Sequence, residues 1–153
     1  MKARAQIIVP GRISEAEALW YDTRRWPTFI EGFHHVVKAS MGWPGEGELS
    51  WESSPDGRGR VLEKVTRFEP RVGQTAEVFE ERSTGTQSIS FVARPEDRVE
   101  ITLEFDYRLT KRPGGPLYSI VDAIFIRPRQ REALQRTLVR FARELAVEQS
   151  LEG

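Results

Sequence analysis

The N-terminal third of the chain changes from a strand-like to a helical spacing of apolar residues. Residues 3–9 (ARAQIIV) have the composition of a short strand, which a Pro-Gly pair ends. Ser14 and Glu17 then form an S-x-x-E capping box in front of an apolar stripe, which predicts a helix over about 15–22. A second short helix is predicted from Pro27 to near residue 32, because proline fits the first turn of a helix.

From residue 34 to residue 110 the chain alternates apolar and polar positions. Turn-forming residues divide this stretch into runs of strand length, which predicts an antiparallel meander of about six strands. Residues 46–53 and 99–109 show the alternation best, so one face of the sheet is expected to be apolar and the other charged. The apolar positions of the second run are Val99, Ile101, Leu103, Phe105, Tyr107 and Leu109.

The C-terminal third returns to a helical spacing. Leu134, Leu138, Phe141 and Leu145 share one stripe, which predicts a long amphipathic helix. Residues 117–126 are apolar nearly all round and are expected to be its most enclosed part, with Pro128 marking a kink or a restart. Four arginines fall on nearly the opposite side of the helix: Arg129, Arg136, Arg140 and Arg143. Arg127 and Arg131 bring the arginines of this helix to six.

This order of elements predicts a single α+β domain over residues 1–153. The chain has one strand, two short helices, about six further strands and one long helix. A long amphipathic helix needs an apolar surface on which to bury its stripe, and a strongly curved sheet supplies one. A curved sheet around a helix can also leave a space between them.

Composition narrows the possible partners and locations. Lys plus Arg and Asp plus Glu number 23 each, so no net charge attracts the chain to DNA or an acidic membrane. Cysteine is absent, which excludes disulfides and thiolate chemistry. The N-terminus lacks the apolar segment of a signal peptide, and no run is long enough to span a bilayer. We therefore expect a cytoplasmic protein, and the sequence does not predict its oligomeric state.

Four segments together resemble the START-related superfamily, whose members include the birch-pollen allergens, and within it the polyketide cyclase/dehydrase-like group. They are residues 14–37 (SEAEALWYDTRRWPTFIEGFHHVV), 57–70 (GRGRVLEKVTRFEP), 98–109 (RVEITLEFDYRL) and 129–146 (RQREALQRTLVRFARELA). The resemblance implies a helix-grip fold, in which a roughly seven-stranded antiparallel sheet curls around the C-terminal helix and encloses a pocket. Residues 14–37 also resemble the coenzyme Q-binding branch. Such folds serve many functions, so the site must be argued separately.

Binding of a hydrophobic small molecule is the favoured function, with a lipid, a quinone or a polyketide-like aromatic as its ligand. The expected pocket is lined by aromatic and aliphatic side chains, and a buried Tyr107 phenol could hydrogen-bond an oxygen of the ligand. These lining residues are Trp51, Phe91, Leu103, Phe105, Tyr107, Ile120, Ile124 and Phe125. The short second helix would supply a gate from Trp26, Phe29 and Phe33.

A polyketide cyclase, aromatase or dehydratase is the first alternative, and it needs an acid or a base. His34 and His35 titrate near neutral pH, but neighbours on a strand point to opposite faces, so at most one would reach the interior. Glu80 would be a candidate if it pointed inward beside Val78, with Lys64 as a counter-ion. Neither the histidines nor the carboxylates have metal-ligand spacing, and no motif predicts a cofactor.

A macromolecular interaction module is the second alternative. The six arginines of the C-terminal helix, set against Glu132 and Glu144, would permit a minor RNA or ribosome contact, or a protein partner. The absence of an aromatic residue on this stripe argues against base stacking. The simplest interpretation of the stripe is a solvated helix face.

Overall fold

Seven antiparallel strands form one curved sheet in the computed structural model, which describes residues 2–54, 59–109 and 127–152. Their order across the sheet is β1-β7-β6-β5-β4-β3-β2, so only the first strand lies away from its sequence neighbours. The strands are β1 (Lys2–Pro10), β2 (Phe33–Ala39), β3 (Glu48–Ser53), β4 (Arg60–Glu69), β5 (Gly73–Phe79), β6 (Ser83–Arg94) and β7 (Arg98–Leu109).

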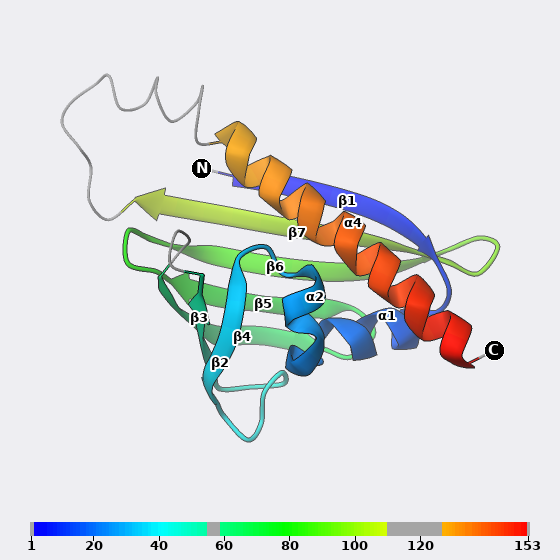
Figure 1. The fold of residues 1–153 in the computed structure, drawn as a ribbon, viewed down its shortest axis with the longest axis horizontal. Helices are drawn as coiled ribbons and strands as arrows, with labels where there is room; N and C mark the ends of the chain where they lie inside the picture. The colour runs from blue at the N-terminus through cyan, green and yellow to red at the C-terminus, as the bar shows by residue number, and fades with distance from the viewer. Residues whose placement is uncertain (1, 55–58, 110–126, 153) are drawn as a thin grey trace.

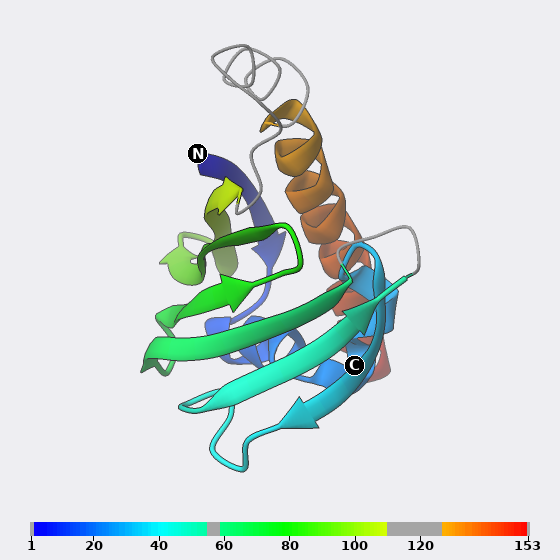
Figure 2. The same cartoon turned by 90° about the vertical axis from the view of Figure 1, so that its left-hand side faces the viewer.

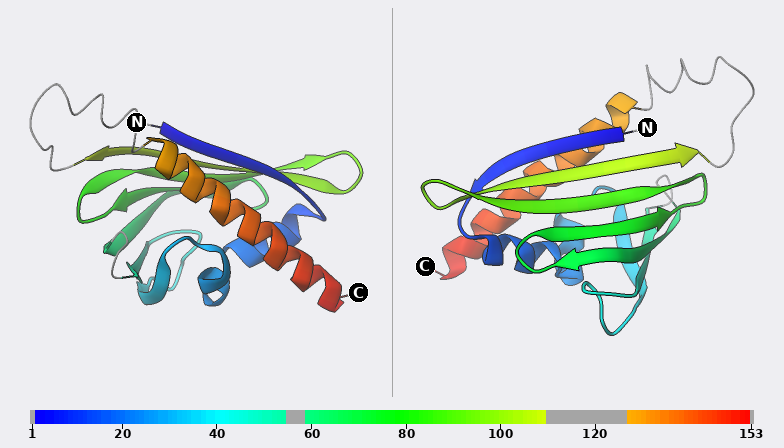
Figure 3. Two further views of the ribbon diagram at one scale, coloured as in Figure 1. Left: turned by 45° about the horizontal axis from the view of Figure 1, so that its top comes forward. Right: turned by 180° about the vertical axis from the view of Figure 1, so that it is seen from behind.

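Helix α4 (Arg127–Glu152) crosses the concave side of this sheet (Figure 1). Figure 2 shows the sheet curling around the helix, and Figure 3 shows α1 (Ile13–Trp20) and α2 (Trp26–Phe29) gathered at one end of the sheet. The α+β class, the seven-stranded sheet and the two early helices are thereby confirmed. Pro128 lies in the first turn of α4, where its missing N–H costs no hydrogen bond. The apolar stretch 117–126 lies outside the described residues.

The apolar face of the sheet belongs to one core with α4 and the short helices, as the alternation predicted. Val99, Ile101, Leu103, Phe105 and Tyr107 are all buried, while the charged residues between them face outward. Helix α4 contributes the matching stripe, with its buried members Leu138, Phe141 and Leu145. Burial of these two surfaces against each other is the main source of stability in this fold.

The predicted start of the first helix is wrong in its details. Helix α1 begins at Ile13, and the side chain of Glu15 accepts a hydrogen bond from the backbone N–H of Arg12 at 2.9 Å. Glu17, the expected capping partner of Ser14, instead accepts a hydrogen bond from the backbone N–H of Arg71 in the turn between β4 and β5. Glu15 is therefore the acidic residue that caps the helix, and Glu17 connects the helix to the sheet.

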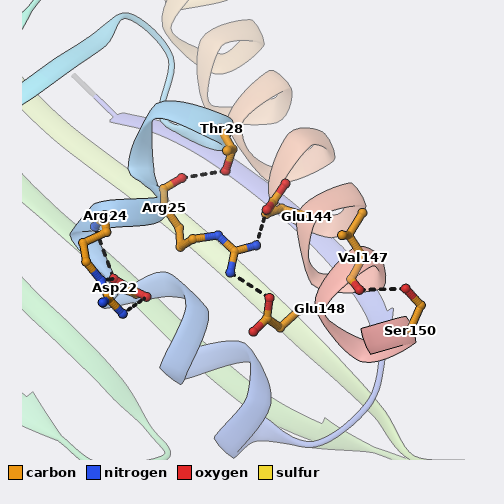
Figure 4. A network of polar contacts seen from close by, with 8 residues as sticks. All are labelled: Asp22, Arg24, Arg25, Thr28, Glu144, Val147, Glu148 and Ser150. Atoms are coloured by element: carbon orange, nitrogen blue, oxygen red, sulfur yellow. Dashed lines mark hydrogen bonds and ion pairs between the residues drawn. The ribbon is translucent and has the colours of Figure 1, made fainter. Parts of the chain in front are cut away.

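An arginine fixes the short helices to α4. Arg25, at the end of a 3-10 turn (Thr23–Arg25), forms ion pairs with Glu144 and Glu148, the second at 2.7 Å (Figure 4). These two carboxylates raise the pKa of the Arg25 guanidinium. Its neighbour Arg24 points away and pairs with Asp22, whose pKa is lowered by hydrogen bonding to Arg24. Arg25 thus positions the start of α2 against α4.

Replacing Arg25 by alanine is expected to destabilise the protein by about 1 kcal/mol, because it leaves two neighbouring carboxylates on α4 without their shared cation. Urea denaturation followed by tryptophan fluorescence would measure the change. Arg24→Ala is the matched control, and its denaturation midpoint should stay close to that of the wild type because Arg24 is exposed. Equal midpoints for the two variants would contradict this role of Arg25.

Candidate functional site

A cavity of about 510 Å³ lies between the concave face of the sheet and α4. This volume is within the range of roughly 300–1,000 Å³ that is typical of small-molecule sites. Its lining comes from both short helices, from five strands and from the first half of α4: Trp20, Trp26, Ile30, Glu31, Gly32, Trp51, Ser54, Glu63, Gln74, Gln87, Leu103, Phe105, Gln130, Ala133, Leu134 and Thr137.

Three tryptophans form much of the apolar wall. Trp26 is held by a hydrogen bond of 2.7 Å from its indole N–H to the backbone oxygen of Trp20. The rings of Trp26 and Trp51 lie edge to face, with their centroids 6.4 Å apart. Each of the three side chains is at most 3% exposed, so the wall is rigid and presents ring faces and edges to the cavity.

Three polar side chains project into the cavity from adjacent strands of the sheet: Glu63 from β4, Gln74 from β5 and Gln87 from β6. We call this set the polar floor. Gln87 pairs in register with Ala76, two residues along β5 from Gln74, so the two glutamines are diagonal neighbours about 7–8 Å apart at Cα. The cavity is therefore apolar on its tryptophan side and polar on its sheet side.

Glu63 is the most informative member of the polar floor. It is only 4% exposed, and its Oε2 accepts a hydrogen bond of 2.7 Å from the indole N–H of Trp51. Carboxylates are rarely buried at this level without a specific role. Glu63 is not among the residues predicted from the sequence, although Val61, Glu63 and Val65 alternate on one face of β4 and thus place a glutamate between two apolar neighbours.

A short segment, residues 30–32, crosses the rim of the cavity between α4 and the end of β3. Glu31 forms ion pairs with Arg136 at 3.2 Å and with Arg140 at 2.8 Å, and its backbone N–H donates to Thr137 Oγ1. On the other side, the oxygen of Gly32 accepts a hydrogen bond of 2.8 Å from the N–H of Ser54. Gly32 has a φ of +72°, a conformation that favours glycine.

The structure brings together some of the residues that the sequence placed in the pocket. Trp51, Leu103 and Phe105 line the cavity. Tyr107 is buried and stacks on Phe105, with ring centroids 5.4 Å apart, but it is not part of the lining. Phe91 is buried elsewhere, against Tyr21, where burial raises the pKa of the Tyr21 phenol. The other three predicted lining residues, Ile120, Ile124 and Phe125, lie outside the described residues.

The three residues expected to form a gate occupy different environments. Trp26 lines the cavity. Phe29 is fully buried and packs on Phe141 with ring centroids 5.2 Å apart, so it belongs to the core. Phe33 is half-buried and contacts the rings of both Trp26 and Trp51. The residues that border the rim are instead those at positions 30–32.

Glu80 is half-buried just beyond the end of β5 and is not among the described residues that line the cavity. Ala76 and Val78 do face the interior, but β5 ends at Phe79, and the Glu80 N–H donates to the oxygen of Ser83 in the turn to β6. Lys64 is exposed on the outer face, where it pairs with Glu48 at 3.7 Å.

The expectation that His34 and His35 face opposite ways is wrong. Their Nδ1 atoms are 2.6 Å apart, and both side chains are exposed on the edge strand β2. The pairing of β2 with β3 shifts register between Phe33 and His35, and such an irregularity breaks the alternation of a regular strand. Neither histidine lines the cavity.

The arginine stripe of α4 is partly occupied by intramolecular pairs. Arg136 and Arg140 hold Glu31, whereas Arg131 and Arg143 are exposed; nothing is described of the side chains of Arg127 and Arg129. Among the described residues, no group of three or more His, Asp or Glu side chains could hold a metal ion. None of the helices in the described part of the chain has the length and apolar character needed to cross a bilayer.

Known proteins resemble this chain in structure alone. The sequence matches no protein-family model and no curated protein. A protein from Thermus thermophilus superposes with a TM-score of 0.76 at 13% identity, over 97% of this chain and 99% of the other. Norcoclaurine synthase from Thalictrum flavum, solved with a transition-state analogue, gives 0.69 at 12% identity, over 97% and 96%.

A START superfamily protein from Mycobacterium smegmatis gives a TM-score of 0.62 at 11% identity, over 88% of this chain and 94% of the other. These similarities span nearly the whole of each protein, and they agree with the order of strands and helices described above. Identities this low establish the fold and leave the function to be argued from the site. The chain thus has a helix-grip fold, which it shares with these proteins.

Proposed function

We propose that the protein binds a hydrophobic small molecule in the cavity between the sheet and α4. The observation that carries this proposal is a cavity of about 510 Å³ walled by buried tryptophans. A concave, largely apolar site of this size with a few polar groups is typical of small-molecule binding. Similar folds occur in a START superfamily protein and in norcoclaurine synthase, which supports a small-molecule role.

Affinity would come from the apolar wall and orientation from the polar floor. Transfer of a ring system from water to a surface made of Trp20, Trp26, Trp51 and Phe105 is favourable in proportion to the apolar area buried. The few polar groups of such a site fix the orientation of the ligand.

A neutral fluorescent probe tests this proposal directly. N-phenyl-1-naphthylamine should bind with a stoichiometry of one, with a rise in its emission and quenching of tryptophan emission, because three tryptophans line the cavity. Bound lipid should also appear in organic extracts or native mass spectra of the purified protein. Linear, non-saturable emission together with an empty extract would contradict the proposal.

One observation also favours an enzymatic role on a poly-β-ketone, as in a polyketide cyclase or dehydratase. Glu63 is a buried carboxyl group inside the cavity, within reach of any ligand that fills it. In such a reaction the carboxylate removes a proton from an activated methylene, and the carbanion adds to a ketone carbon of the same chain to give an alkoxide. The alkoxide takes the proton back from the carboxylic acid, and the resulting hydroxyl then leaves as water together with a second proton from the adjacent carbon. The cavity would supply the folded conformation of the substrate.

The effect of Glu63→Gln on product formation distinguishes an enzyme from a binding protein. An enzyme of this kind would convert a linear poly-β-ketone to a cyclic product with loss of water, and the variant would lose this conversion while still binding N-phenyl-1-naphthylamine. A binding protein would yield no product above the uncatalysed rate with either the wild type or the variant. Mass spectrometry of the reaction mixture distinguishes these outcomes.

A further inference from the structure

We propose that ligands enter and leave the cavity between residues 30–32 and α4, and that the ion pairs of Glu31 with Arg136 and Arg140 hold this passage closed. This inference rests on the proposed function and adds to it the route of ligand exchange and the contact that controls it. We call residues 30–32, which connect α2 to β2, the strap.

The strap separates the cavity from solvent. Ile30, Glu31 and Gly32 all line the cavity, yet the side chain of Glu31 is 34% exposed. The three tryptophans of the wall, by contrast, are at most 3% exposed. A residue that borders the cavity and also reaches solvent marks the boundary of the cavity, so one segment of chain forms the barrier at this position.

Glu31 attaches the strap to α4 by polar contacts. Its carboxylate pairs with Arg136 at 3.2 Å and with Arg140 at 2.8 Å, and its backbone N–H donates to Thr137 Oγ1 at 3.2 Å. The two arginine side chains are 49% and 44% exposed, so these ion pairs are screened by solvent and are individually weak. Contacts of this kind break at a lower cost than the apolar contacts of the core.

The elements on either side of the strap are fixed independently of it. Helix α2 ends at Phe29, which is fully buried, and β2 begins at Phe33. The oxygen of Gly32 accepts a hydrogen bond of 2.8 Å from the N–H of Ser54, which attaches the strap to the sheet. Gly32 has a φ of +72°, and hinges are formed by a few loop residues that absorb changes in φ and ψ. An outward movement of the strap would therefore break its contacts with α4 without unfolding α2 or β2.

Exchange kinetics of N-phenyl-1-naphthylamine test the inference. Glu31→Gln keeps the size of the side chain and removes its charge, and we expect the association and dissociation rates of the probe both to rise about fivefold. The dissociation constant should change by less than about twofold, because the ion pairs slow passage in both directions equally. Stopped-flow mixing measures the association rate, and dilution of the complex measures the dissociation rate.

Added salt should act on the wild type as Glu31→Gln does. Raising the salt concentration from about 20 to about 500 mM shortens the Debye length from roughly 20 Å to roughly 4 Å, so the wild-type rates should approach those of the variant, whose own rates should change little. Glu48→Gln is the matched control, because Glu48 also pairs with a cation, Lys64 at 3.7 Å, but on the outer face of β3. Its exchange rates should equal those of the wild type at both salt concentrations.

A covalent link between the strap and α4 tests the passage from the opposite direction. The chain has no cysteine, so Glu31→Cys and Arg140→Cys together supply its only two thiols. The two replaced side chains contact each other in the wild type, so a short bismaleimide can join the thiols. We expect the linked protein to exchange the probe at least about tenfold more slowly than the same protein capped with N-ethylmaleimide, because a covalent link does not open as an ion pair does.

Equal exchange rates in the linked and the capped protein would overturn the inference, since the probe would then pass elsewhere. Wild-type rates in Glu31→Gln would overturn it too, as would faster dissociation at an unchanged association rate, because Glu31 would then contact the bound probe instead of controlling its passage. The linked protein decides the matter if Glu31→Gln does not fold. A wild-type protein that does not bind the probe would instead count against the proposed function itself, so the two failures are distinguishable.

Discussion

Phe141→Ala should reduce the free energy of unfolding by about 3–5 kcal/mol, the usual cost of removing a buried phenylalanine. Phe141 is fully buried on α4, and its ring contacts Trp20 and Phe29 with centroids 5.6 and 5.2 Å away. Truncation would leave a void where α1, α2 and α4 meet, and it would remove two edge-to-face contacts. Equilibrium denaturation in urea measures the change.

Val147→Ala is the matched control for this prediction. Val147 is on the same helix but 51% exposed, so its truncation should change the free energy of unfolding by less than about 0.5 kcal/mol. A loss below about 1 kcal/mol for Phe141→Ala would mean that the short helices do not depend on α4 for their placement, contrary to the packing described above.

Ala133→Trp is expected to weaken probe binding at least tenfold without unfolding the protein. Ala133 is half-buried on α4 and lines the cavity, so a tryptophan there would occupy the space that the ligand needs. Titration with N-phenyl-1-naphthylamine gives the dissociation constant, and circular dichroism reports whether the helix and sheet content is retained.

Ala146→Trp separates occlusion from a general effect of the substitution. Ala146 is exposed on the same helix and takes no part in the lining, so this variant should bind the probe as the wild type does. Unchanged binding in Ala133→Trp would place the probe somewhere other than this cavity.

The fold could be predicted from the sequence because the spacing of apolar residues is clearly that of strands in one part of the chain and that of a helix in another. Alternation over 99–109 and the stripe formed by Leu138, Phe141 and Leu145 place one apolar sheet face against one helix, and the structure confirms both. The helix cap was placed wrongly because capping depends on where the chain turns. Both Glu15 and Glu17 are close enough in sequence to cap this helix. Glu15 accepts the hydrogen bond from the backbone N–H of Arg12, whereas Glu17 accepts one from the backbone N–H of Arg71.

The site was less predictable because it depends on local irregularity and on register. A shift in the β2–β3 pairing puts His34 and His35 side by side, and the early end of β5 leaves Glu80 in a turn. Glu63 was recognisable in principle from its alternation with Val61 and Val65. Its role depends on Trp51, twelve residues away in sequence, which only the pairing of β3 with β4 brings near.

The most direct test of ligand binding in the cavity is a nuclear Overhauser experiment on the protein saturated with N-phenyl-1-naphthylamine. We expect contacts from the ring protons of this probe to the methyl groups of Leu103, Ala133 and Leu134, all of which line the cavity. Contacts to Val147 and Leu151 on the exposed end of α4 should be absent. Contacts confined to those two residues, or to Val37 on β2, would contradict the account, because the ligand would then lie on the surface.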